Sequence, residues 1–329
     1  MCHVEPVDRQ GYGLDALWND DFHHSAMVAL TGRSEAYYSD TTGRPQELIS
    51  AAKYGFLFQG QFYHWQQQTR GRPALDLAPG QFVVFLQNHD QIANAARGLR
   101  GHALTSPAKW RAMTALLLLM PGTPMLFQGQ EFAASNPFLY FADFEDDLAA
   151  AVRKGRAEFL SQFPSIDAYG RSCALDDPGD ERNFVRCKLD FAERETNAPA
   201  YTLHRDLLSM RRGTVAFRSQ RPHGVDGAVL SEAAFVLRYL TEDPTETRLL
   251  IVNLGGDLKR PSFAEPLVAP PPGHAWTVNW SSEDPRYGGG GTPQPPITGE
   301  WFLTAETAIV LAPASERTVA SGPVRRRTA

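Results

Sequence analysis

The chain has 329 residues, 43% of them hydrophobic, which is enough for one large domain or two ordinary ones. Its formal charge is −5 at pH 7 and its sequence pI is about 6.0. This weakly acidic balance gives no sign of nucleic-acid binding, which requires a basic surface.

The cysteines and the hydropathy of the chain indicate the cellular compartment. The three cysteines, Cys2, Cys173 and Cys187, form neither a metal-ligand spacing nor an even disulfide set, which favours a reducing compartment. No apolar stretch reaches the roughly 18 residues of a membrane-spanning helix, and the first residues contain no apolar signal segment. We therefore expect a cytoplasmic protein with no membrane or nucleic-acid partner.

The first expected element is a short, mostly apolar strand over Leu14 to Trp18. A polar block follows it, with two carboxylates and two imidazoles: Asp20, Asp21, His23 and His24. These groups suit Zn²⁺ or Fe²⁺, but adjacent histidines cannot easily face one ion, so we expect no metal. Contacts with ligand hydroxyls from a loop above the strand are the better interpretation.

Two helices and two groups of aromatic residues come next. A helix is expected to begin at Ser25 and to be interrupted at Gly32, and a second is expected over Gln46 to Phe56, with Pro45 in its first turn. Aromatic residues at 37–38 and 62–65 lie among glycines and prolines. They could stack on a ligand, although aromatic residues more often pack in the core.

The central stretch is a continuous apolar run, Phe82 to Leu86, typical of a strand buried on both faces of a parallel sheet. It ends in Gln87, Asn88, His89, Asp90 and Gln91. In an α/β barrel the ligand chemistry lies where strands end, and a His-Asp pair suits a polar or positively charged substrate centre. Such residues also cap helices well, so both interpretations remain open.

A strand–helix–strand unit follows the central strand. Ser106 and Pro107 predict the start of a helix that runs through the apolar residues to Met120. A short buried strand over 124–127 comes next, which makes a right-handed βαβ unit. Glu131 lies just after that strand, where an acid could contact substrate, but anchoring the loop is the more common role for such a residue.

The rest of the chain changes from helical to β texture. Helices are expected over 148–162 and 201–212, with a loop over 176–183 between them. From about Gly224, short apolar runs alternate with Pro- and Gly-rich turns, which predicts an all-β module. We expect its sheets to bury their own core.

The triplet Asn88-His89-Asp90 resembles the seventh-strand signature of the α-amylase superfamily of glycoside hydrolases, family 13. Three blocks together resemble one family within it, the malto-oligosyltrehalose trehalohydrolases: 17–24, 87–94 and 121–132. The block at 17–24 is the one that points to this family and not only to the superfamily. The resemblance extends from about Gly11 to the C-terminus.

The resemblance implies an α/β fold, the C-terminal part of a (β/α)8 barrel (about strands 6–8) followed by an antiparallel β-sandwich. We expect a partial barrel over 1–223, a β-sandwich over 224–315 and a mobile tail over 316–329. The resemblance also implies that Asp90 stabilises the transition state by holding substrate hydroxyls, with His89 donating a hydrogen bond beside it. Further substrate-binding residues are then expected to be Trp18, Asp20, Asp21, His23, His24, Asn88, Gln91, Glu131 and Tyr140.

Glycoside hydrolysis uses two carboxylates that flank the scissile bond. In the family, the nucleophilic Asp lies on the fourth barrel strand and the acidic Glu on the fifth, both upstream of the position that matches Gly11. Glu5 is followed by proline and preceded by no apolar strand, so it is not assigned the acid role. We therefore expect an N-terminally truncated enzyme that is inactive alone.

The resemblance implies release of trehalose from maltooligosyltrehalose or a related α-glucan, with retention and without a cofactor or metal. One alternative is a non-catalytic glucan-binding fragment. Another is half of a split enzyme that needs a complementing N-terminal chain. A third is a different superfamily member, such as a glucan branching enzyme or an amylase.

Overall fold

The computed structural model describes residues 3–4, 7–95, 97–166, 176–293 and 300–316. Cys2, Glu5 and Cys173 lie outside these residues, and so does almost all of the expected tail.

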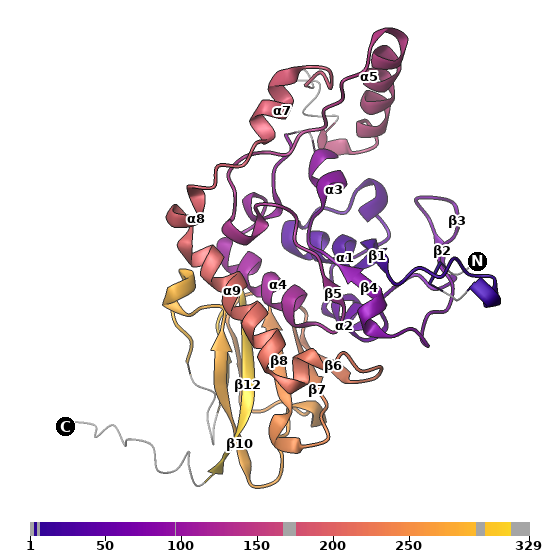
Figure 1. The fold of residues 1–329 in the computed structure, drawn as a ribbon. Helices are drawn as coiled ribbons and strands as arrows, with labels where there is room; N and C mark the ends of the chain where they lie inside the picture. The colour runs from indigo at the N-terminus through magenta and orange to yellow at the C-terminus, as the bar shows by residue number, and fades with distance from the viewer. Residues whose placement is uncertain (1–2, 5–6, 96, 167–175, 294–299, 317–329) are drawn as a thin grey trace.

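A three-stranded parallel sheet lies at the centre of the N-terminal part (Figure 1). Its strands, in spatial order, are β1 (Leu17–Asn19), β4 (Phe82–Val84) and β5 (Thr123–Pro124). All three strands were predicted, but each is shorter than the apolar run from which it was predicted. Because the strands are parallel, their carboxyl ends meet at the same edge of the sheet. The polar residues that follow β1 and β4 are therefore neighbours.

The helix after β1 begins earlier than predicted. Helix α1 (Asp20–Thr31) starts directly at the strand because the Asn19 side chain accepts the backbone N–H groups of Asp21 (3.1 Å) and Phe22 (3.5 Å). It ends at Gly32, whose φ of 69° is the left-handed conformation common at this position. The expectation that the polar block 20–24 forms a loop is therefore wrong, because it forms the first turns of a helix.

The other helices surround the sheet and continue along the chain. Four were predicted within a few residues: α2 (Pro45–Tyr54), α4 (Pro107–Leu119), α5 (Asp146–Leu160) and α9 (Ala198–Gly213). Among the short ones, α3 (His89–Ala93) matches the helix-capping interpretation of Asn88, whereas three were not predicted: α7 (Glu181–Cys187), α8 (Glu193–Thr196) and α10 (Val215–Arg218). A small hairpin, β2 (Phe62–Tyr63) with β3 (Gln68–Thr69), was also not predicted. Among the described residues, no helix is both long and apolar enough to cross a membrane.

The C-terminal part is antiparallel, as expected. A five-stranded sheet has the order β10 (His274–Ser281), β12 (Thr307–Ser315), β8 (Arg248–Asn253), β7 (Ala234–Tyr239), β6 (Val225–Ser231). A separate pair, β9 (Leu258–Arg260) with β11 (Trp301–Leu303), supplies the second layer of the sandwich.

Both faces of the five-stranded sheet are covered, but by different parts of the chain. Alternate residues such as Phe235 and Leu250 pack with α2 and α4 in one continuous core. Their neighbours Val236 and Leu249 face the other way and pack with Leu303 of β11. The main core thus crosses the expected boundary at Gly224, and the β-module does not bury all of its own apolar surface.

Candidate active site

An exposed group of side chains lies at the carboxyl ends of β1 and β4. Trp18 is 49% exposed and packs against the buried Phe85, with ring centroids 5.8 Å apart. Its ring also meets His89 edge to face at 6.2 Å, and His89 Nε2 lies 3.4 Å from Asp90 Oδ1. The side chains of His89 and Asp90 are both more than half exposed. An open aromatic surface therefore lies beside an imidazole and a carboxylate.

Helix α3 sets the direction of this His-Asp pair. Asn88 is almost fully buried, and its Oδ1 accepts the backbone N–H of Gln91 at 2.9 Å, which caps the helix. His89 and Asp90 then occupy the first turn, which faces solvent. The two interpretations of this triplet are compatible, because Asn88 serves as the cap and its neighbours remain free for a ligand.

Asp20 lies in the electrostatic field of this group. Burial raises the pKa of its carboxyl, and the nearby negative charges of Asp21 and Asp90 act in the same direction, while Arg70 opposes them. Asp20 is partly desolvated and lies close enough to Asp90 for the two carboxylates to interact, which suits a site that binds polar groups.

Asp21 is buried and binds other parts of the protein, so it is not exposed to a ligand. It is 1% exposed, and its Oδ2 accepts the backbone N–H groups of Leu57 (2.8 Å) and Phe58 (3.0 Å). Its Oδ1 pairs with Arg70 Nη2 at 3.1 Å. Both oxygens are engaged, so the expected direct contact between Asp21 and a substrate finds no free atom, and we reassign this residue to holding the loop at 57–58.

His23 is likewise engaged inside the protein. Its Nδ1 donates to the Leu86 carbonyl at 2.8 Å, and its Nε2 accepts the Tyr38 hydroxyl at 3.0 Å. Burial lowers the pKa of His23 to about 4, so the ring is neutral at pH 7. His23 therefore ties α1 to the end of the central strand and has no nitrogen left for substrate.

His24 is also buried, and its ring stacks on Tyr37 at 5.2 Å. Burial, with His23 and Arg70 adding to it, holds its pKa well below the usual range. The aromatic residues 37–38 thus pack against the two histidines, in line with the core interpretation.

Gln91 and Tyr140 connect α3 to neighbouring segments. Gln91 Oε1 accepts the Tyr37 hydroxyl at 2.8 Å. Tyr140 is 39% exposed, and the Arg156 guanidinium lies over its ring at 4.8 Å. Arg156 Nη1 also donates to Asn94 Oδ1 at 2.6 Å, so α5 is fastened to the C-terminal end of α3.

Glu131 belongs to a short turn after β5, where its Oε1 lies 3.9 Å from Arg194 Nη2 of α8. This contact fits the loop-anchoring role better than a substrate-binding one. In the part of the chain that the structure covers, no three His, Cys, Asp or Glu side chains are grouped to hold a metal ion.

Sequence reasoning missed Arg70 and Arg156, which hold Asp21 and α3. No local pattern marks them, because their partners come from distant segments of the chain.

Comparisons with known proteins identify the fold. A family described as a domain of unknown function (DUF3459) matches residues 222–301. A crystal structure of a putative α-amylase from Salmonella typhimurium matches with a TM-score of 0.71 at 28% identity, covering 90% of this chain and 46% of that one. The fold is therefore that of an α-amylase superfamily protein, with the C-terminal part of the barrel followed by the antiparallel β-domain.

Curated relatives indicate which family within the superfamily this chain resembles. The chain is 38% identical over 254 residues to malto-oligosyltrehalose trehalohydrolase of Deinococcus radiodurans, covering 75% of this chain and 40% of the relative. It is 40% identical over 154 residues to the protein of the same name from Saccharolobus solfataricus, covering 46% of this chain and 27% of that one. The chain is thus homologous to the C-terminal region of malto-oligosyltrehalose trehalohydrolases, as the sequence predicted, and spans about 40% of the first relative's length.

Proposed function

We propose that this chain forms the substrate-binding, transition-state-stabilising part of a glycoside hydrolase that releases trehalose from maltooligosyltrehalose. The observation that carries the proposal is the convergence of Trp18, His89 and Asp90 at one edge of the parallel sheet. The names of the curated relatives support this substrate over those of other superfamily members.

Each group in the site has a distinct task. The exposed Trp18 ring offers a flat apolar face on which a glucosyl ring can stack. Asp90 places a negative charge where the oxocarbenium-like transition state develops positive charge. His89, next to it, donates a hydrogen bond to a sugar hydroxyl. These groups bind and stabilise but do not break the bond themselves.

Bond cleavage needs an acid and a nucleophile or base in addition. Asp21 and Glu131 are two acids in the matched blocks that could take these roles. However, Asp21 is buried in an ion pair with Arg70, and Glu131 lies beside Arg194. We assign the two catalytic carboxylates to the barrel strands that precede the matched region in the relatives. Residues 1–329 alone are then a glucan-binding polypeptide, which acts with a complementing N-terminal segment or chain, and which we place in the cytoplasm.

A chimera tests the proposal. The N-terminal region of the Deinococcus radiodurans relative is joined to residues 11–329 of this chain, and the products from maltooligosyltrehalose are separated by chromatography. We expect trehalose as the product of the chimera and no hydrolysis by residues 1–329 alone. A folded chimera that releases only glucose or forms branched glucan would overturn the assignment.

If the chimera does not fold, calorimetric titration of residues 1–329 with maltohexaose gives a second test. Binding supports the site, and its absence in a folded protein contradicts the site.

A further inference from the structure

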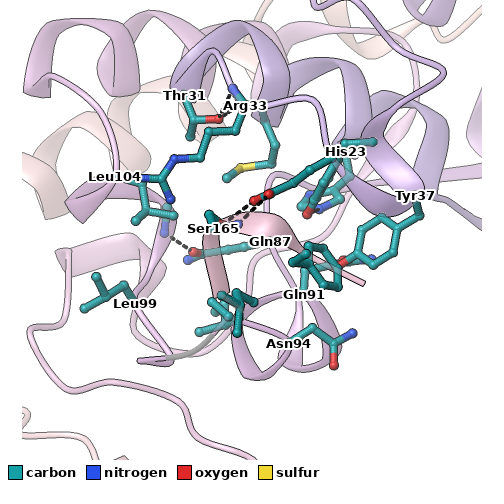
Figure 2. A pocket seen from close by; sticks show the side chains of 18 of the residues that line it. His23, Thr31, Arg33, Tyr37, Gln87, Gln91, Asn94, Leu99, Leu104 and Ser165 are labelled. Carbon is teal, nitrogen blue, oxygen red and sulfur yellow. Dashed lines mark hydrogen bonds between the residues drawn. The ribbon is translucent and has the colours of Figure 1, made fainter. Parts of the chain in front are cut away.

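A partly open cavity of about 320 Å³ lies between α1 and α3 (Figure 2). Helix α1 contributes Met27 and Thr31 to its wall, and α3 contributes Gln91 and Ile92. Of the described residues in α3, His89 and Asp90 do not line it. The cavity therefore excludes the exposed His89–Asp90 pair, although the same short helix borders both, and His23 and Gln91, which were expected to bind substrate, line the cavity.

Its size suits an organic ligand. A cavity of about 150 Å³ holds benzene, and ligand pockets begin at about 300 Å³. The volume here is about twice the first value and falls within the second range. A molecule of roughly ten non-hydrogen atoms fits such a space.

The wall is apolar over much of its area, which favours a ligand with an apolar body. Aliphatic and aromatic side chains meet there from three separate segments: Met27, Ile92, Leu99, Leu104, Phe163 and Ile166. Two hydrogen bonds fix the last of these segments, because Ser165 donates from its backbone N–H (3.0 Å) and its hydroxyl to the carboxylate of Glu35.

The polar groups left over at the wall are donors. Arg33 reaches across the cavity toward Leu104 in Figure 2, and its guanidinium has no partner among the described residues. Gln87 Oε1 accepts the Gly101 N–H at 2.8 Å, but its buried Nε2 has no hydrogen-bond partner. Glu35 is the sole carboxylate among the described lining residues, and Ser165 occupies it. An acceptor-rich ligand group complements this set.

We propose that this cavity binds a small organic anion: an apolar body of roughly eight carbons packs between α1 and α3, and its carboxylate pairs with Arg33. The site does not depend on the proposed hydrolase activity, since it uses neither His89 nor Asp90.

Calorimetric titration of the purified chain with octanoate, with neutral octanamide and with maltose tests the proposal. We expect octanoate to bind more tightly than octanamide, and prior saturation with maltose not to weaken octanoate binding. Arg33→Gln should weaken octanoate binding at least about tenfold, because it removes a charge-assisted hydrogen bond, and should leave octanamide unchanged. Arg44→Gln, at an exposed arginine outside the cavity, is the matched control.

A second variant tests the location. Ala95 lines the cavity, so Ala95→Leu fills part of it without altering any charge and should abolish binding of both octanoate and octanamide. Circular dichroism confirms that each variant is folded. The proposal is overturned if octanoate binds Arg33→Gln as tightly as the parent, if Ala95→Leu leaves its binding intact, or if the folded parent binds no octanoate at millimolar concentration.

Discussion

Asn88, His89 and Asp90 are adjacent in the chain but have different environments. Asn88 is buried and accepts a backbone N–H, whereas the next two side chains are open to solvent beside Trp18. The cap makes the exposure possible, because it starts α3 at the point where the strand ends. A ligand at this edge therefore meets a ring, an imidazole and a carboxylate together.

Trp18→Ala should weaken maltohexaose binding by about tenfold, equivalent to about 1.4 kcal/mol, because the stacking face is lost. The side chain is half exposed, so the melting temperature should change little. Calorimetry and thermal denaturation measure the two effects. Phe191→Ala, at another exposed aromatic residue, is the control and should not alter binding. Unfolding of Trp18→Ala would show that the ring is a core residue.

His23 predicts a pH dependence of stability. The unfolded chain protonates this residue below about pH 6.5, but the folded protein does so only near its pKa of about 4. Its contribution is complete above about pH 6.5 and is lost as the pH falls toward 4, by up to roughly 3 kcal/mol. His24 acts in the same direction.

His23→Asn should be less stable at pH 7.5 but should lose less stability between pH 6.5 and 4.5 than the parent. The amide still offers a donor to the Leu86 carbonyl and does not titrate. Urea denaturation at several pH values measures the slope. Equal slopes for variant and parent would contradict the role assigned to the buried ring.

The sequence indicated which types of residue follow the strands, but it did not indicate which of their side chains are buried. The polar block at 20–24 marked the end of a strand, and Asp20 lies there in the electrostatic field of Asp90. Asp21 and His23 turned inward because their partners, Arg70 and the Leu86 carbonyl, come from segments that only the fold brings near.

Element boundaries depended on capping more than on apolar runs. Ser106 and Pro107 predicted the start of α4 correctly, since the cap is a local signal. Asn19 also caps a helix, but the strand before it made the block look like a loop. Short helices such as α7 and α8 have too few turns for a periodic pattern and were missed.

The cap of α3 makes a prediction at this scale. Asn88→Ala should cost about 1 kcal/mol of stability and weaken maltohexaose binding, because the first turn that holds His89 and Asp90 loses its acceptor. Asn88→Ser should recover most of both, since a serine hydroxyl also caps. Urea denaturation and calorimetry provide the readouts, and failure of serine to restore binding would indicate a direct role for the amide.

The whole molecule is held together by a core that crosses from the helices to the β-domain. The change of texture near Gly224 predicted a β-module, and the antiparallel sheet begins at Val225. The shared core could not be predicted, because alternation along a strand gives two apolar faces without saying what covers each. The Lys53–Asp226 ion pair at 2.7 Å also spans the boundary.

Residues 224–316 expressed alone should therefore aggregate or be only partly folded, in contrast to the expectation of a self-sufficient sandwich. The face that contains Phe235, Leu250 and Val310 loses its cover of α2 and α4. Light scattering and circular dichroism test this. A soluble, cooperatively melting monomer would show that the second layer of the sandwich is sufficient.

Trehalose release by the chimera with Asp90→Asn tests the central claim most directly. The substitution removes a charge at nearly constant shape from an exposed position. We expect the rate to fall at least about 100-fold with the fold intact, while Asp76→Asn, at an exposed aspartate elsewhere, keeps the parental rate. A near-parental rate for the folded Asp90→Asn chimera would remove Asp90 from the active site and contradict the account.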